Sequence, residues 1–181
     1  MAADRIRVAA SLRAMAPLVR TLRSGDDAAL ADIWEQAFIG DGHVRVSGRA
    51  VIRDVADTRR RGVVFVATED EVLLGGVVLA SQDTLVADRT RGELEVQRLG
   101  VARSGRGRGI AEKLMRAVMH EAHARGADAL VLWTRPSMLA AQRLYERIGF
   151  ERLAERDFPR DGRTMLVYRY LFPAAKHAAH G

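Results

Sequence analysis

The chain has 181 residues, of which 48% are hydrophobic and 29% are charged, and it contains no cysteine. This size and mixture are typical of one globular domain with a sizeable core, and they exclude disordered and collagen-like chains. Without cysteine there is no disulfide, thiolate metal site or cysteine nucleophile, which fits a reducing compartment, so we expect a cytoplasmic protein. The apolar runs are too short to span a bilayer, so we expect no membrane partner.

The net charge of +6 is unevenly distributed along the chain. Residues 98–116 contain six basic residues and one acidic residue, so this segment alone has a net charge of +5. Local basicity of this kind suits either a nucleic acid or a small polyanion. The elements around the segment decide between the two.

Strand and helix patterns occupy the middle of the chain. Residues 1–16 and 173–181 lack them, so we expect a flexible N-terminal extension, one domain over residues 17–172 and a disordered tail. Hydrophobic periodicity, caps and turn residues predict seven strands and four helices. In chain order these are a strand at 18–22, a helix from 24–27 to Phe38, a weaker helix at 48–60, strands at 63–68, 72–80 and 93–101, a helix from Ile110 to Gly126, a strand at 128–134, a helix at 137–148, and strands at 150–157 and 164–171.

This order of elements predicts an α/β (α+β) domain, in which helices cover the faces of a mixed sheet. A glycine-rich loop, RSGRGRG at residues 103–109, connects the strand predicted at 93–101 to the helix predicted from Ile110 to Gly126, which has the clearest apolar periodicity of the chain. Glycine lets a backbone approach a ligand, and the first turn of a helix leaves amides unpaired at the positive end of its dipole. The loop therefore predicts a phosphate site. It lacks the Gly-Lys-Ser/Thr ending of a P-loop and the acidic ribose contact of a dinucleotide site.

An Arg-Gly segment that binds RNA is the alternative, although such tracts are usually repeated and disordered. Two motifs favour the phosphate site, because together they resemble the GNAT superfamily of CoA-dependent N-acyltransferases. Arg106, Gly109 and Ala111 match the family pattern of Arg or Gln, two residues, Gly, one residue, then Gly or Ala. Residues 141–150, AQRLYERIGF, match its Ala-x-x-Leu-Tyr-x-x-x-Gly-Phe motif, and residues 95–101 resemble its fourth strand.

The resemblance covers residues 18–171 in element order and implies a mixed, mostly antiparallel sheet of six to seven strands, flanked by about four helices, with strands 4 and 5 splayed. It also implies acetyl-CoA as co-substrate, with loop amides around the diphosphate and strand 4 main-chain groups beside the pantetheine arm. The implied cofactor-binding residues are Leu99, Gly100, Val101, Arg103, Arg106, Gly107, Arg108, Gly109, Ile110, Ala111 and Ala141. Where the family often has an Asn that contacts the arm, this chain has Met138.

The same resemblance implies two catalytic residues. Tyr145 matches a tyrosine whose hydroxyl can protonate the CoA sulfur, and Glu95 matches a position that is a general base in some members, directly or through water. The structural alternatives are that Tyr145 packs in the core with Phe150 and that Glu95 is exposed or salt-bridged.

In the family fold, the first two helices and the last hairpin border the acceptor cleft. The residues that this points to are Trp34, Phe38 and Phe158, with Asp41, His43 and Asp161 as further candidates. Each also has a structural or exposed-loop interpretation. The histidines show no metal-ligand spacing, so we expect no metal and a solvated His120 and His123 pair.

These features predict direct transfer of an acetyl group from acetyl-CoA to a primary amine of a small molecule, protein or peptide. Two other classes remain open: a non-catalytic CoA-binding sensor or regulatory domain, and a basic nucleic-acid-binding module. Since the excess charge surrounds the glycine loop, a small polyanion is the better match and we expect no nucleic-acid partner. Exposed sheet edges and the Met-rich helix permit a homodimer without requiring one.

Overall fold

The computed structural model describes residues 16–82 and 84–173. The expected N-terminal extension and C-terminal tail fall almost entirely outside these described residues. None of the helices in these ranges combines the length and the hydrophobicity that a membrane span requires.

An eight-stranded sheet runs through the centre of the molecule in the order β1-β2-β3-β4-β5-β8-β6, and β7 pairs with β8. Every neighbouring pair is antiparallel except β4 and β5, which confirms the predicted mixed sheet. The strands are β1 Leu18–Thr21, β2 Gly62–Glu69, β3 Val72–Ala80, β4 Glu93–Val101, β5 Ala129–Thr134, β6 Glu151–Arg152, β7 Phe158–Arg160 and β8 Arg163–Leu171.

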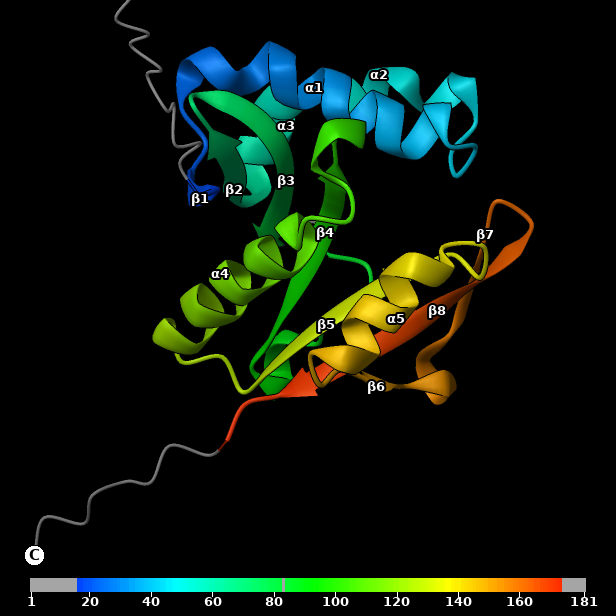
Figure 1. Ribbon diagram of the computed structural model, residues 1–181. Coiled ribbons are helices and arrows are strands. Elements are labelled where there is room, and N and C mark those ends of the chain that lie inside the picture. Colours follow the sequence, from blue (N-terminus) through cyan, green and yellow to red (C-terminus); the bar gives the residue numbers. More distant parts are fainter. Residues whose placement is uncertain (1–15, 83, 174–181) are drawn as a thin grey trace, which may run out of the picture.

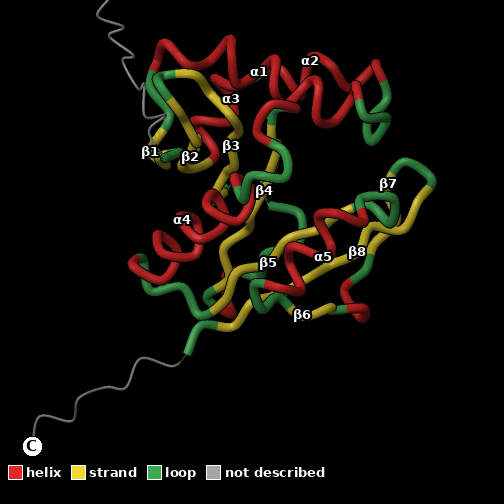
Figure 2. The backbone as a smooth tube through the Cα atoms, in the orientation of Figure 1, coloured by secondary structure: helices red, strands yellow, loops and turns green. Residues whose placement is uncertain are grey.

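Helices cover both faces of the sheet (Figure 1). They are α1 Asp27–Glu35, α2 Arg49–Arg53, α3 Val55–Arg61, α4 Ile110–Ala124 and α5 Leu139–Arg147. One core cluster joins α4 and α5 to one face, through residues such as Leu114 and Leu144, and a second joins α1 and α3 to the other, through Leu30 and Val55. Figure 2 shows α1, α2 and α3 gathered near β1–β3, with α5 beside β5 and β8.

The predicted helix over residues 48–60 is two helices, α2 and α3. The chain breaks at Asp54, whose side chain accepts a hydrogen bond from the Asp57 amide at 2.7 Å. Aspartate competes with the helical backbone in this way and starts a new helix as its N-cap.

The helix predicted over residues 137–148 begins later, because residues 135–138 form a turn in which the Met138 amide donates to the Arg135 carbonyl at 3.0 Å. Met138 is therefore the N-cap residue of α5. The strand predicted over residues 150–157 is also shorter. It is confined to β6, because a 3-10 turn at Ala154–Arg156 follows, and β7 is the additional strand.

Candidate active site

Strands β4 and β5 separate from each other partway along their length. They pair in parallel only at Glu93 to Glu95 with Ala129 to Val131. Beyond these pairs, residues 96–101 of β4 and 132–134 of β5 have no partner on their facing edges, and we call this opening the β4–β5 wedge. Figure 1 shows the two strands diverging from their paired ends. Unpaired strand edges offer amides and carbonyls to an extended ligand that itself carries amides.

A bulge in β4 accompanies this divergence. Arg98 has a φ of 54°, in the left-handed region, and the register with β3 shifts between Gly76 and Val78. Bulges bend a strand and increase its local twist, which turns the second half of β4 away from β5. The splayed strands that the family resemblance implied are therefore present.

The glycine loop lies at the wide, open end of the wedge, directly after β4. Gly107 and Gly109 have φ values of 72° and 73°, and no atom lies within 4 Å of where a Cβ atom would stand on either. The Lys113 amide donates to the Gly109 carbonyl at 3.0 Å, whereas no backbone acceptor among the described residues takes the amides from residues 107 to 112. Free amides above open space at the start of α4 form a cradle for phosphate.

Arginines of the loop are paired with carboxylates from distant segments. Arg106 lies 2.5 Å from the Asp41 carboxylate, and Arg103 lies 3.8 Å from it. Arg108 lies 2.6 Å from Glu69 at the end of β2. A phosphate that bound to these side chains would replace or share those carboxylates, so the backbone amides are the uncommitted donors of the cradle.

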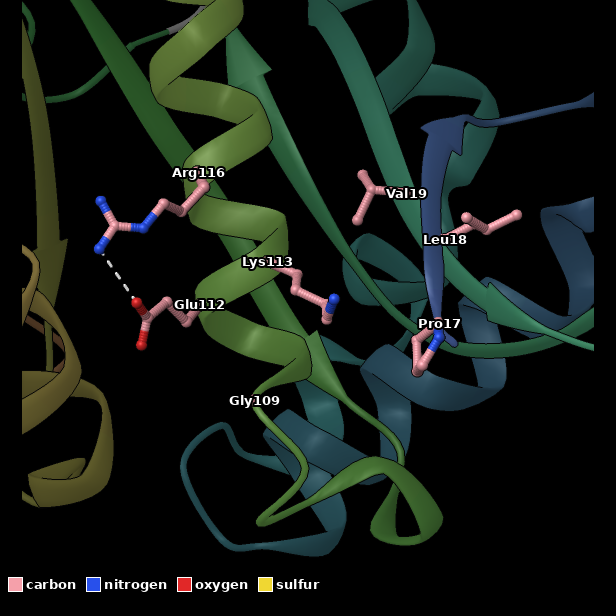
Figure 3. A pocket seen from close by; sticks show the side chains of 7 residues that line it. All are labelled: Pro17, Leu18, Val19, Gly109, Glu112, Lys113 and Arg116. Atoms are coloured by element: carbon pink, nitrogen blue, oxygen red, sulfur yellow. Dashed lines mark hydrogen bonds and ion pairs between the residues drawn. The ribbon is translucent and has the colours of Figure 1, made fainter. Parts of the chain in front are cut away.

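A hollow of about 450 Å³ lies on the β1 side of α4 and touches the loop at Gly109. Figure 3 shows Lys113 directed toward β1, whereas Glu112 and Arg116 extend to the other side and form an ion pair of 3.0 Å. Apart from Gly109, none of the predicted cofactor-binding residues lines this hollow. It is therefore distinct from the β4–β5 wedge.

The remaining predicted cofactor residues lie along the wedge and the loop. Leu99, Gly100 and Val101 belong to the unpaired part of β4. The Ile110 side chain is buried in the core, so only its backbone faces a ligand. Ala141, in the first turn of α5, packs against the same core cluster.

Tyr145 is 6% exposed and lies in the core cluster of α4 and α5. Its ring centroid is 6.0 Å from that of Phe150 and 5.9 Å from that of Tyr168. Burial, with a smaller contribution from Tyr168, raises the pKa of the Tyr145 hydroxyl. The side chain thus keeps its proton at neutral pH while it packs as the structural alternative anticipated.

Glu95 is fully buried, and its carboxylate holds the loop between β3 and β4. One carboxylate oxygen, Oε2, accepts hydrogen bonds from the amides of Leu85, Val86 and Ala87 at 2.8, 2.8 and 3.2 Å. The other oxygen, Oε1, accepts one hydrogen bond of 2.9 Å from the side chain of Gln97. Glu95 is therefore not exposed, and Oε1 is the oxygen with remaining capacity to accept a proton.

The predicted acceptor residues have different environments. Trp34 has no exposed surface, and its ring packs beside Gly100, where a Cβ atom would approach Cδ1 to 2.8 Å. It is part of the core, because the apolar side of α1 faces the sheet, and it does not line an open cleft as we had expected. Phe38 is half-buried against the same cluster, and Phe158 is half-buried on β7.

Four segments meet around His43, which lies in the turn after α1. Desolvation lowers the pKa of His43, and the charges of Arg135 and Arg106 act in the same direction, whereas Asp41 opposes them. Arg135, only 8% exposed at the end of β5, pairs with Asp161 in the β7–β8 turn at 3.0 Å. The candidates Asp41, His43 and Asp161 therefore belong to one charged cluster that also contains the loop arginine.

Sequence reasoning missed Trp133 and Arg135. Trp133 stacks edge-on against Phe158 at a centroid distance of 5.7 Å, and the Arg160 guanidinium lies 5.1 Å from the Trp133 ring centroid. Alternation along β5 puts Trp133 on the sheet face opposite Leu132, so the strand pattern itself could have revealed it.

No three His, Asp or Glu side chains in the described ranges are grouped to hold a metal. His120 and His123 are exposed on α4.

Comparison with known proteins gives the same outline. A family model described as the acetyltransferase (GNAT) family matches residues 28–150. N-alpha-acetyltransferase 30 of Schizosaccharomyces pombe is 36% identical over 86 residues, which are 48% of this chain and 55% of that protein. N-acetylaspartate synthetase of Danio rerio is 38% identical over 80 residues, or 44% of this chain and 28% of that protein. The matches thus span about half and about a quarter of these relatives.

Among solved structures, that of yncA from Salmonella typhimurium with its cofactor acetyl-CoA is similar in fold. Its TM-score is 0.66 at 22% sequence identity, and the alignment covers 91% of this chain and 98% of that one. The wedge, the glycine loop and the family match agree, and the chain belongs to the acetyltransferase (GNAT) family.

Proposed function

We propose that this protein transfers the acetyl group of acetyl-CoA to the α-amino group of a peptide or amino acid. The observation that carries the proposal is the β4–β5 wedge, which ends at a loop of free amides beside a cluster of arginines. The names of two curated relatives, an N-alpha-acetyltransferase and an N-acetylaspartate synthetase, denote acetylation of an α-nitrogen, and they support this acceptor class.

Residues of the wedge and the loop would hold acetyl-CoA. The amides of residues 107–112 suit its diphosphate, and the free edge of β4 at Leu99 and Val101 suits the amide-bearing pantetheine arm. Arg103, Arg106 and Arg108 supply positive charge next to these amides. A ligand of this size and charge accounts for the basic segment without a nucleic acid.

Bound acetyl-CoA would supply an activated acetyl group, which the acceptor nitrogen takes as the carbon–sulfur bond breaks. Tyr145 would then give its hydroxyl proton to the departing sulfur. A tyrosine hydroxyl has an ordinary pKa of about 10 and burial raises that of Tyr145 further, so the hydroxyl carries its proton at neutral pH. It regains a proton from solvent once the products have left.

Glu95 would accept the proton that the amine loses. The carboxylate is buried, so this transfer runs through a water molecule at Oε1. The α-amine of a peptide has a pKa of about 7.7–8.0, so most of it is protonated at neutral pH and must lose a proton before it attacks. Trp133 and Phe158 lie on the sheet face toward which Glu95 also points, and we propose that they border the acceptor.

Two peptides of the same sequence test the acceptor class. In one the N-terminus is free and the lysine side chain is blocked, and in the other the N-terminus is blocked and the lysine is free. With acetyl-CoA and the full chain, mass spectrometry should show acetylation of the first peptide and little of the second. Preferential acetylation of the second peptide would contradict the proposal and would indicate that the acceptor is a lysine side chain.

A further inference from the structure

One buried hydroxyl in the wedge has no partner. Thr134 is 3% exposed, and its Oγ1 atom makes no hydrogen bond within the described part of the chain. Buried polar side-chain atoms are nearly always hydrogen-bonded, because an unpaired one keeps the full cost of losing water. An orphaned hydroxyl of this kind in a ligand-binding region points to a partner that arrives with the ligand.

The position of Thr134 relates this hydroxyl to the wedge. Thr134 is the last residue of β5, where it pairs with Leu166 of β8 on one edge and has no β4 partner on the other. It lies three residues beyond Val131, the last residue that pairs with β4. At roughly 3.3 Å per residue, it stands about 10 Å from the closed end of the wedge toward its open end.

The side chain faces the helices α4 and α5. Alternate residues of a strand share a face, so Thr134 points to the same side as Leu130 and Leu132. Both leucines belong to the core cluster that contains Tyr145, and Ala141 packs against that cluster. Thr134 is thus on the side of the sheet where the proposed acid lies.

We propose that the Thr134 hydroxyl hydrogen-bonds an amide of the pantetheine arm of bound CoA. The inference rests on the proposed function. The phosphate cradle lies at the open end of the wedge and Glu95, the proposed base, lies at the closed end. The diphosphate of bound CoA would therefore lie at the open end and the thioester near the closed end. Thr134 lies between the two, beside the pantetheine arm. A hydroxyl can donate to an amide carbonyl or accept from an amide N–H, so it suits either edge of the arm. Met138, at the start of α5, offers no such group.

The matched variants Thr134→Val and Thr134→Ser test the contact. Valine keeps the shape and removes the hydroxyl, so the ligand-free protein should melt a few degrees higher, since an unsatisfied buried group is gone. Calorimetric titration should show CoA and acetyl-CoA bound about threefold to tenfold more weakly. Adenosine 3′,5′-bisphosphate, which lacks the arm, should bind both proteins equally, and Thr134→Ser should resemble the wild type.

Unchanged CoA affinity in Thr134→Val would refute the contact but would not contradict the proposed acetyl transfer. A wild-type protein that does not bind CoA would refute the proposed function as well, so the two failures are distinguishable. An equal loss of affinity for the bisphosphate would show a general distortion and would also contradict the contact. If the valine variant does not fold, Thr134→Ala provides the same comparison without the risk of overpacking.

Discussion

Tyr145 and Tyr168 are neighbouring buried tyrosines with different hydroxyl environments. The Tyr168 hydroxyl donates to Glu146 at 3.3 Å, whereas the proposal needs the Tyr145 hydroxyl for the leaving sulfur. Tyr145→Phe should lower kcat about 100-fold or more and leave the KM for acetyl-CoA within about twofold, because a proton donor acts on the chemical step. Initial rates of thiol release measure both constants.

Tyr168→Phe is the control for this change, since it removes a hydroxyl from the same cluster and leaves the Tyr145 hydroxyl in place. It should retain most of kcat. Equal kcat losses in the two variants would mean that the cluster needs both hydroxyls for packing, and Tyr145 would lose its chemical role.

Glu95 has two separable proposed functions. Its Oε2 atom accepts hydrogen bonds from three amides of the loop between β3 and β4, and its Oε1 atom would receive the proton of the acceptor amine. Glu95→Gln should lower kcat/KM at neutral pH, and the deficit should narrow as pH rises above about 8, where the α-amine is already deprotonated. Rates for wild type and variant between about pH 6.5 and 9.5 measure this gap. A deficit of the same size at every pH would indicate that Glu95 only positions the loop.

His43 gives the protein a pH-dependent stability. Desolvation holds its pKa below the ordinary value of about 6.5, so the unfolded chain binds this proton more tightly than the folded chain. The free energy of unfolding should therefore fall as pH drops below about 6.5, and His43→Gln should reduce this fall. Urea unfolding at several pH values provides the test, and identical slopes for both proteins would contradict it.

At the scale of the element, the loop before α4 and the turn after it contain glycines with the same backbone geometry. Gly109 has a φ of 73° and Gly126 a φ of 74°, and at neither residue does any atom lie within 4 Å of the place that a Cβ atom would take. Alanine at either site should cost about 1–2 kcal/mol of stability, because an L-residue is strained there. Only Gly109→Ala should also weaken acetyl-CoA binding, by about tenfold, since its Cβ would project into the cradle.

Gly126→Ala is thus the matched control, with the same strain at the far end of α4. Thermal unfolding and calorimetric titration measure the two effects separately. Equal acetyl-CoA affinity in both variants would remove the loop from the binding site.

Elements with strong local signals were predictable from the sequence. The hairpin of β2 and β3 follows from two β-branched runs and an acidic turn, and α4 follows from its periodic apolar residues and Gly126. The break between α2 and α3 was not, because it depends on whether Asp54 caps a new helix or continues the old one. Short strands such as β6 depend on pairing with β8, which local patterns do not contain.

At the scale of the whole molecule, the resemblance to the GNAT superfamily implied the splayed strands and the glycine pattern predicted the phosphate loop, but neither indicated which side chains meet there. Asp41 and Arg106 are 65 residues apart, and only the fold brings them to 2.5 Å. Trp34 was misassigned because an aromatic residue on an amphipathic helix suits a cleft and a core equally. Thr134 was missed because an orphaned hydroxyl is recognisable only when all neighbouring groups are known.

The two halves of the molecule meet along the wedge. Helices α1 and α3 cover β2 and β3, and α5 covers the β5 and β8 side. The core cluster around α4 spans both halves, whereas the strands β4 and β5 pair at only three positions. A ligand that binds both free edges would replace the missing pairing and fasten the halves together. This is the physical reason to expect acetyl-CoA to stabilise the whole fold.

Calorimetric titration of acetyl-CoA into the full chain tests the central claim most directly, because binding in the wedge underlies every proposed step. We expect saturable binding of one acetyl-CoA per chain, weakened by Gly109→Ala and unaffected by Gly126→Ala. Absence of saturable binding to the folded wild-type protein would contradict the claim.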